Sequence, residues 1–381
     1  MFFLPLMLGA AILQVASMHM MPIRDHEILR LSDQTVIREE QLVTALAGHR
    51  IVLIGEAHDN PAHHAVQLKM IQALHARHRE LAVALEMFPR SLQPQLDRWV
   101  AGELSENAFL DGVEWYFTWG FDAELYMPIF RFARERRIPL LAMNLPRETV
   151  GKVRRKGMAE LDISLRDTLP PICPASLAYR LRLEEVFNAH EMISKSGKFD
   201  HFVESQTLWD GVMADTLRNW SRSHPHGVVV GLAGTGHLLK GHGIPHQLRQ
   251  RGVEDLVTLL PWTGADSWVD PDAADYVWGT PAAPESPPPM RLGVVLDERR
   301  SDGAWLKEVG EESPGARAGL KAGDQLLRLD DLEIRSRHAL VRLLNDMPRD
   351  GRIRLSYRRD GQEREVFVSR PTPESHASRS Q

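Results

Sequence analysis

The stretch "IVLIGEAHDNPAHH", residues 51–64, decides the fold class of this 381-residue chain. Its first part, residues 51–56, is apolar and ends in a carboxylate, as a strand buried on both faces of a parallel sheet does. Pro61 then starts a helical pattern in which Ala65, Leu68 and Ile71 share one face. A buried strand that leads directly into a helix predicts a βαβ unit.

The same alternation continues and predicts an α/β domain over residues 30–265, with a mostly parallel sheet, helices on both faces and a helical insertion. Further strands are expected at residues 81–86, 139–145, 227–234 and 255–261, and longer helices at about 123–136, 176–194 and 203–223. Residues 266–287, which include "GTPAAPES", predict a proline-rich linker. A small β-rich domain is expected at 288–370, and a disordered tail at 371–381.

The N-terminus "MFFLPLMLGAAILQVAS" is apolar and too short for an ordinary membrane span. Residues 1–20 are therefore predicted to be a signal peptide or a retained anchor, which makes the protein exported and periplasmic or membrane-associated. The net charge is −5 and no basic stripe is present beyond "KVRRK" at 152–156, which argues against a nucleic-acid partner. The single cysteine, Cys173, excludes an intrachain disulfide framework.

Polar side chains follow four of the predicted strands. Glu56 and His58 end the first, Glu86 ends the second, and His237 follows the glycine-rich end of the fourth. Ligands of open parallel sheets bind at the carboxyl ends of the strands, so these four side chains are expected to meet in one crevice. The third strand adds Arg147 to the same edge.

Two chemistries fit this set of side chains. Glu56, His58 and His237 suit a borderline divalent metal such as zinc, manganese or iron. Together with Glu86 they equally suit a general acid–base array without a metal. Asp210, on the helix expected at 203–223, fits either a buried partner or a surface acid.

Four motifs resemble the ChaN family of haem-binding proteins, which belongs to a wider group with the Tiki metalloproteases. They are "LIGEAHDNPAHHAVQLKMIQAL", "ALEMF", "LYMPIFRFARERRIPLLAMNLPRE" and "GLAGTGHLLKGHGIPHQL", and the resemblance covers roughly residues 40–280. It implies haem binding in bacterial iron acquisition, in a homodimer that encloses haems between its subunits. In the Tiki branch, the positions of His58 and His237, with Glu56 as the neighbouring acid, lie in a metal-dependent proteolytic site.

A haem site needs an axial ligand and cations for the propionates. Tyrosinate ligates ferric haem, so Tyr126 in "ELYMPIF" is the preferred axial candidate. Arg147 is expected to bind a propionate as a bidentate donor. His63, in the first turn of the helix after residue 60, is a further candidate for contact with the cofactor.

The C-terminal segment "MRLGVVLD…SPGARAGLKAGDQLLRLDDLEI…SRHALVRLLNDM" resembles a PDZ domain of the bacterial HtrA type. The resemblance implies binding of the C-terminal peptide of a protein partner by β-augmentation. The backbone N–H groups of Leu292, Gly293 and Val294 are expected to hold its carboxylate, and Val341 and Leu344 to line the pocket.

These observations give two hypotheses. The preferred one is an exported haem- or iron-binding protein with a peptide-binding PDZ domain. The alternative is a divalent-metal-dependent hydrolase, a peptidase to which the PDZ domain presents polypeptides, with Glu56 or Glu86 as the base. The sequence contains neither an HExxH helix nor a nucleophile elbow.

Overall fold

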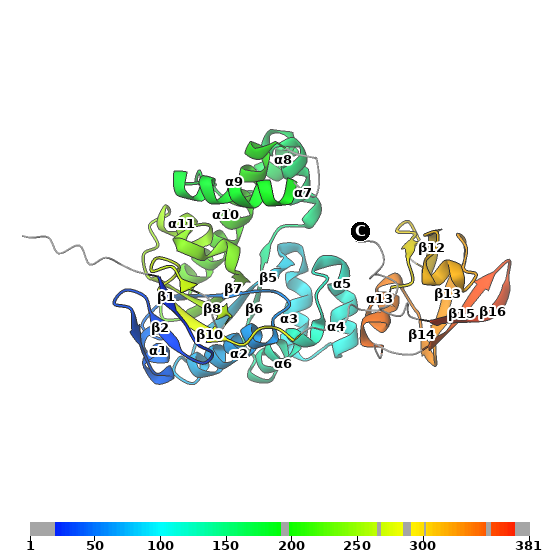
Figure 1. Cartoon of the computed structure of the whole chain (residues 1–381), viewed down its shortest axis with the longest axis horizontal. Coiled ribbons are helices and arrows are strands. Elements are labelled where there is room, and N and C mark those ends of the chain that lie inside the picture. The colour runs from blue at the N-terminus through cyan, green and yellow to red at the C-terminus, as the bar shows by residue number, and fades with distance from the viewer. Residues whose placement is uncertain are drawn as a thin grey trace, which may run out of the picture.

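The computed structural model describes residues 20–191, 198–264, 268–284, 291–300, 302–347 and 352–369, and it divides them between an α/β domain and a C-terminal β-rich domain (Figure 1). Residues 1–19 of the predicted signal peptide or anchor lie outside the described part, and so does the predicted tail at 371–381. The α/β domain contains, in chain order, β1 (Met21–Pro22), β2 (Ile28–Arg30), β3 (Thr35–Val36), α1 (Glu39–Leu46), β4 (Ile51–Glu56), α2 (Pro61–His75), β5 (Leu81–Pro89), α3 (Gln93–Ala101), α4 (Glu106–Gly112), α5 (Trp115–Thr118), α6 (Met127–Arg136), β6 (Leu140–Asn144), α7 (Arg147–Lys156), α8 (Ile163–Arg166), α9 (Leu177–Glu191), α10 (Phe199–Ser223), β7 (Val228–Gly234), α11 (Ile244–Arg249), β8 (Leu256–Thr263), β9 (Trp268–Val269) and β10 (Tyr276–Thr280).

The central sheet has the strand order β3-β2-β10-β8-β4-β7-β5-β6. Strands β10, β8, β4, β7, β5 and β6 are mutually parallel, and only β2 runs against its neighbours. The predicted α/β class with a mostly parallel sheet is thus confirmed. The carboxyl ends of β4, β5, β6 and β7 all meet at one edge of this sheet, which is where the predicted polar side chains follow.

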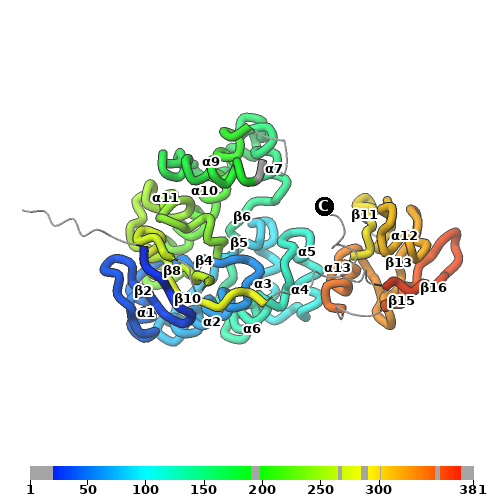
Figure 2. The backbone as a smooth tube through the Cα atoms, in the orientation of Figure 1, coloured from blue at the N-terminus to red at the C-terminus, as the bar shows by residue number. Residues whose placement is uncertain are grey.

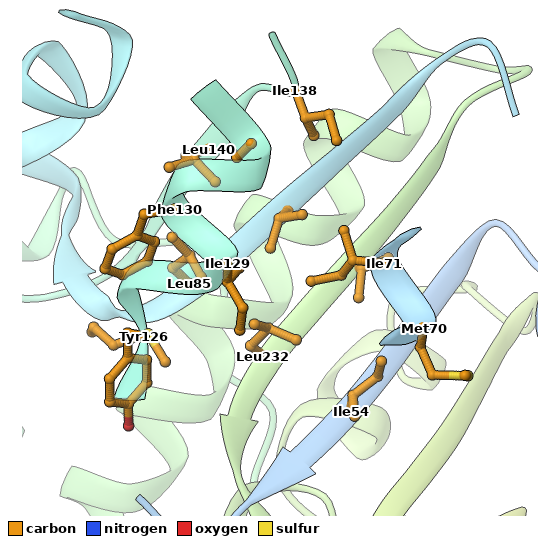
Figure 3. Close-up of a cluster of buried hydrophobic side chains, with 14 of the residues drawn as sticks. Ile54, Met70, Ile71, Leu85, Tyr126, Ile129, Phe130, Ile138, Leu140 and Leu232 are labelled. Atoms are coloured by element: carbon orange, nitrogen blue, oxygen red, sulfur yellow. The ribbon is translucent and has the colours of Figure 1, made fainter. Parts of the chain in front are cut away.

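Alternate residues of each strand pack on opposite faces of the sheet. In β4, Val52 and Ile54 belong to the core formed with α1, α2, α3, α4 and α6, whereas Ile51 and Leu53 belong to the core formed with α10 and α11. Figure 3 shows part of the first core, with Tyr126 at its edge. Both faces are covered by helices, which is why the strands are continuous apolar runs rather than alternating ones.

Helix α2 begins where the sequence signals it. The Asn60 side chain accepts a hydrogen bond from the Ala62 N–H at 2.9 Å, and Pro61 occupies the first helical position. This start places the first turn of α2 directly after the loop that carries His58. The helices α7 to α10 form the predicted insertion between β6 and β7, and α7 to α9 stand away from the sheet in Figure 2.

The predicted linker at 266–287 is wrong over part of its length. Residues 276–280 form β10, which lies in the central sheet between β2 and β8, and β9 pairs with β1. Val277 is fully buried there. The prolines at 281, 284 and 287, which suggested a linker, come after β10 in the sequence. A strand of only five residues next to them gives too short a pattern to be recognised. Residues 265–267 and 285–290 lie outside the described part.

The C-terminal domain contains β11 (Val294–Leu296), β12 (Ala304–Val309), α12 (Pro314–Arg317), β13 (Gln325–Leu329), β14 (Leu332–Glu333), α13 (Arg337–Asp346), β15 (Arg352–Arg359) and β16 (Gln362–Ser369). Its sheet has the order β11-β12-β13-β15-β16, so β11 is an edge strand. Leu326, Leu340 and Leu355 are among the residues of its separate hydrophobic core. Helix α13 lies beside α5 of the α/β domain (Figure 1).

Candidate functional site

His58 lies just past the end of β4 and is held from behind by Glu56. His58 Nδ1 donates to Glu56 Oε1 at 2.7 Å, and the same oxygen accepts from the Tyr126 hydroxyl at 2.7 Å. Gln67 donates to the other oxygen of Glu56 at 2.8 Å. Glu56 is buried, whereas the His58 side chain is 29% exposed. Within the described part of the chain, His58 Nε2 makes no hydrogen bond.

A second buried chain of hydrogen bonds ends at Glu86. The Tyr179 hydroxyl donates to Asp210 Oδ2 at 2.8 Å, and His237 Nδ1 donates to Asp210 Oδ1 at 2.6 Å. On its other side, His237 Nε2 lies 3.5 Å from Glu86 Oε1. The second oxygen of Glu86 accepts from the Gly234 N–H at 2.6 Å. Asp210 therefore has a buried partner, one of the two alternatives that its sequence context allowed.

The two chains converge at Gly234. A Cβ atom placed on Gly234 would lie 2.9 Å from His58 Cε1 and 3.7 Å from Glu86 Oε2. The missing side chain leaves room for the imidazole, because real Cβ atoms hardly ever approach another atom so closely. His58 and Glu86 are consequently neighbours at the mouth of the sheet, with Glu56 and His237 one layer behind them.

Burial and neighbouring charges set the protonation of this site. Burial opposes a charge on His237, but Glu86 and Asp210 outweigh it and raise the pKa of His237 to about 10. Burial likewise disfavours the Glu86 carboxylate, yet His237 and His58 hold the pKa of Glu86 below its ordinary value. Burial also opposes protonation of His58, and the hydrogen bond to Glu56 and the charge of Glu86 raise its pKa nonetheless. The site is thus a set of compensated buried charges.

A crevice of about 910 Å³ opens in front of His58 and Glu86. Its apolar wall includes Trp119 and Phe121, whose ring centroids lie 4.6 and 5.0 Å from that of His58. Its polar rim includes three arginines at the start and end of α7, namely Arg147, Arg154 and Arg155. Other lining residues include Met87, Leu92, Val113, Phe117, Asn144, Leu145, Val150, Gln206 and Trp209.

The structure brings together most of the predicted site residues, in two layers. His58, Glu86 and Arg147 line the crevice. Glu56 and His237 stand behind them and make hydrogen bonds or ion pairs to them. The aromatic wall was missed, although "WYFTWGF" at 115–121 is an aromatic-rich stretch that could have signalled it.

Tyr126 lies inside the protein rather than on the crevice surface. It is fully buried, and its hydroxyl donates to Glu56. Burial and the charge of Glu56 raise the pKa of Tyr126 far above its ordinary value. The phenol therefore keeps its proton and positions Glu56, which is a different role from the axial ligand expected from the sequence.

His63 is also a supporting residue. Its Nδ1 accepts from the Ala57 N–H at 2.8 Å, so the proton of the neutral ring sits on Nε2, which lies 2.7 Å from Thr263 Oγ1. Both ring nitrogens are thus used by the protein. Burial, followed by the charge of His64, lowers the pKa of His63 to about 4. The ring fixes the loop between β4 and α2 and has no free nitrogen to offer a ligand.

The predicted bare-metal site finds no support. Among the described residues, no group of three or more histidine, cysteine, aspartate or glutamate side chains is arranged to hold a metal ion. Glu56 and His237 use their polar atoms in the hydrogen bonds given above.

In the part of the chain that the structure describes, no helix is both long and apolar enough to cross a membrane.

A second cavity of about 500 Å³ lies between β11 and α13 of the C-terminal domain. All five residues predicted to bind a peptide line it, namely Leu292, Gly293, Val294, Val341 and Leu344. Gly293 has a positive φ of 69°, as a sharp turn requires. Among the described residues, the N–H groups of Leu292 and Gly293 have no acceptor. The turn therefore offers unpaired N–H donors next to an apolar groove.

Comparisons with known proteins first give the class of this protein, which is an α/β domain of a haem-binding family followed by a PDZ domain. Residues 42–248, more than half of the chain, match the family described as "Haem-binding uptake, Tiki superfamily, ChaN", so the chain belongs to this family. Residues 290–369 match the PDZ domain family. Both resemblances predicted from the sequence are thereby confirmed.

Among solved structures, ChaN of Campylobacter jejuni agrees with this assignment at the level of the fold. This protein, described with cofacial haem binding, is 22% identical with a TM-score of 0.54, over 66% of this chain and 96% of that chain. A mutant of the erythromycin esterase EreC in its open conformation is 17% identical with a TM-score of 0.39, over 63% of this chain and 76% of that chain. The HtrA-type protease AlgW with a decapeptide is 23% identical with a TM-score of 0.20, over 22% of this chain and 30% of that chain. A comparison with curated proteins gives no match.

Proposed function

We propose that the crevice in front of His58 binds haem and that His58 Nε2 is the axial donor. The observation that carries this proposal is the His58–Glu56 pair. Histidines that ligate a metal usually donate their other ring N–H to a carboxylate, which fixes the ring and its tautomer. In this chain Glu56 occupies that position at 2.7 Å, and Nε2 is left without a protein partner among the described residues.

The walls of the crevice fit haem as well. A volume of about 910 Å³ lies within the range of roughly 300–1,000 Å³ that is usual for ligand sites. Trp119, Phe121 and Trp209 provide apolar surface for a porphyrin, and Arg147, Arg154 and Arg155 provide cations for the propionates. When bound, haem would supply an iron that accepts an axial nitrogen from the protein. Since the pKa of His58 is raised, iron and a proton compete for Nε2.

The contacts of the carboxylates favour haem over a bare divalent cation. Glu56 already accepts three hydrogen bonds, from Tyr126, His58 and Gln67. Glu86 is engaged by Gly234 and His237. A bare cation would have to displace these partners, whereas an iron already held by a porphyrin needs only one nitrogen from His58. The hydrolase hypothesis therefore has less support than haem binding.

The PDZ groove is proposed to bind the free C-terminus of a polypeptide. The edge strand β11 can pair with an added strand, and the N–H groups of Leu292 and Gly293 suit a terminal carboxylate. Leu344 and Val341 favour an apolar last residue. The apolar N-terminal stretch supports export to the periplasm or membrane surface as the setting, and the ChaN resemblance supports a homodimer.

Haem titration of the full-length chain, followed by absorbance, tests the main proposal. We expect saturable binding with a Soret band that is weakened or shifted in His58→Ala. Tyr126→Phe should keep the band, because its ring is buried and the hydroxyl that is lost donates to Glu56 Oε1 and to the His58 carbonyl oxygen, not to the crevice. The control is His49→Ala, which removes a half-exposed histidine paired with Asp255 far along the chain. An unchanged band in His58→Ala, or a band lost in Tyr126→Phe, would return the axial role to Tyr126. Gel filtration of the same samples with and without haem tests the dimer.

A further inference from the structure

The short segment 112–121, which contains α5, borders both cavities of the molecule. Gly112, Val113, Glu114, Phe117, Thr118, Trp119 and Phe121 line the crevice. Tyr116 and Gly120, on the other side of the same segment, line the groove of the PDZ domain. The same short segment thus borders both cavities, through different residues.

On the crevice side, this segment is fixed against the site. Trp119 and Phe121 pack on the ring of His58. The buried Trp115 donates from Nε1 to the Phe121 carbonyl at 2.7 Å, which closes the segment into a compact turn. A shift of α5 would therefore change the wall that a haem contacts next to His58.

On the groove side, the segment and α4 are held by α13. Arg342 Nε donates to Asp111 Oδ1 at 3.2 Å, and the Arg342 side chain is only 12% exposed. His338 Nε2 lies 3.0 Å from Glu114 Oε1 and its ring packs edge-on against Phe117. Arg342 is thus mostly covered in its contact with Asp111, whereas Glu114 is 46% exposed and burial lowers the pKa of His338, which favours the neutral ring.

Helix α13 presents its other face to the peptide groove. Leu340, Val341 and Leu344 line the groove, while Arg337, His338 and Arg342 face the α/β domain. Because α13 is a single helix of ten residues, its groove face and its interface move together. A peptide between β11 and α13 therefore acts on the helix that contacts α5.

Each cavity contains residues of both domains. Glu298 and Arg337 of the PDZ domain line the crevice, and Tyr116 and Gly120 of the α/β domain line the groove. A ligand in either cavity can therefore contact both domains only while the domains are docked. Each ligand then stabilises the docked arrangement, which is also the arrangement that the other ligand binds. Two ligands that favour the same arrangement must bind cooperatively, by the same factor in both directions.

We propose that the peptide groove is a composite site completed by Tyr116 and Gly120, and that a C-terminal peptide and haem bind this protein cooperatively. This inference rests on the proposed function, since it requires haem in the crevice. Its partner is a polypeptide with a free carboxylate and an apolar last residue. The positioning contact that transmits the coupling is Arg342 to Asp111.

The test uses the full-length chain and a set of synthetic nonapeptides with free carboxylates and Val, Ile, Leu, Phe, Met or Ala at the last position. The amidated forms serve as controls. The strongest peptide is titrated with and without saturating haem, and haem with and without saturating peptide. We expect each ligand to lower the dissociation constant of the other by about fivefold or more. Tyr116→Ala should weaken the peptide several-fold while leaving haem binding without peptide in place.

Arg342→Ala should reduce the coupling factor towards one, with both ligands still bound. Its matched control is Arg335→Ala, which removes a side chain that is 81% exposed and pairs with Glu333, two residues before it. If no peptide binds through its free carboxylate, or if haem does not bind, the corresponding part of the proposed function fails and the inference falls with it. If both ligands bind but their constants are independent, only the coupling is overturned. An unchanged peptide affinity in Tyr116→Ala overturns the composite groove.

Discussion

His237 Nδ1 lies 2.6 Å from Asp210 Oδ1 in the interior of the α/β domain, at the centre of a chain that runs from Tyr179 to Glu86. Asp210 comes from α10 and His237 from the turn after β7, so the contact ties the helical insertion to the sheet. Asp210 is fully buried and His237 nearly so. A charged pair at this depth makes the position of Glu86 depend on α10, the helix that supplies Asp210.

Asp210→Asn should destabilise the protein strongly. The substitution keeps the shape of the side chain but removes the charge that compensates protonated His237. Removal of one partner from a buried charged pair costs about 3–5 kcal/mol. Denaturant unfolding measures this loss. The control is Asp200→Asn on the same helix, where the carboxylate is 75% exposed and pairs with Arg180, so little change is expected. Equal stability of the two variants would show that the buried pair is not charged.

The stability of the protein should depend on pH through His237. Its pKa is raised to about 10 in the folded state, compared with an ordinary value of 6.5. A raised pKa means that the folded state binds the proton more tightly, so this stabilisation is complete below about pH 6.5 and is lost as the pH rises towards 10. The lowered pKa of Glu86 matters at acidic pH. The stabilisation of the folded state by the Glu86 carboxylate is lost as the pH falls below the ordinary glutamate value of 4.5.

Unfolding free energies measured from about pH 4 to 10 check this dependence. The wild-type protein should be most stable between the two ordinary values and decline on the alkaline side. His237→Gln should start from a lower stability and show a flatter alkaline limb. An alkaline decline of the same size in the variant would assign the effect to another group.

Gly234→Ala should weaken haem binding while the protein still folds. Its φ of −53° suits any residue, so the backbone is not strained. The added Cβ, however, would meet His58 Cε1 at 2.9 Å and push the imidazole away from Glu56. Haem titration and circular dichroism separate the two effects. Gly236→Ala is the matched control in the same turn, because its nearest neighbour, an Arg182 nitrogen, lies 4.0 Å away. Equal haem affinity in the two variants would contradict the placement of His58.

The sequence predicted the frame of the fold and the strand-end residues because both are local signals. The apolar run at 51–56 coincides with β4, and the apolar runs that predicted the other four parallel strands overlap β5, β6, β7 and β8. Strand β10 was missed because five residues beside a proline-rich tract give no periodic signal. Its place between β2 and β8 depends on long-range pairing that no window of sequence contains.

The division of the site into two layers was likewise beyond the sequence. Spacing placed Glu56 and His58 at the same strand end, but not which of them faces the crevice. Glu56 faces away from the crevice because Gln67, from α2, and Tyr126, at the start of α6, donate hydrogen bonds to its two carboxylate oxygens. The same limit explains Tyr126, since a tyrosine suited to iron and one that supports a carboxylate look alike in a motif.

In the PDZ domain, Asp324→Asn should lower the stability of the C-terminal core. Asp324 ends the motif "SPGARAGLKAGD", is fully buried, and receives two hydrogen bonds of 2.7 Å from Arg359. An uncharged amide cannot accept both of them, so Arg359 loses its bidentate partner. We expect a loss of about 3 kcal/mol, seen as faster hydrogen exchange in β13 and β15 of the full-length chain. Asp331→Asn, with a carboxylate that is 89% exposed beside Arg354, is the matched control and should leave exchange unchanged. Exchange that is equally slow in Asp324→Asn would show that the neutral amide replaces the carboxylate without loss, and that the Asp324–Arg359 pair does not hold this core together.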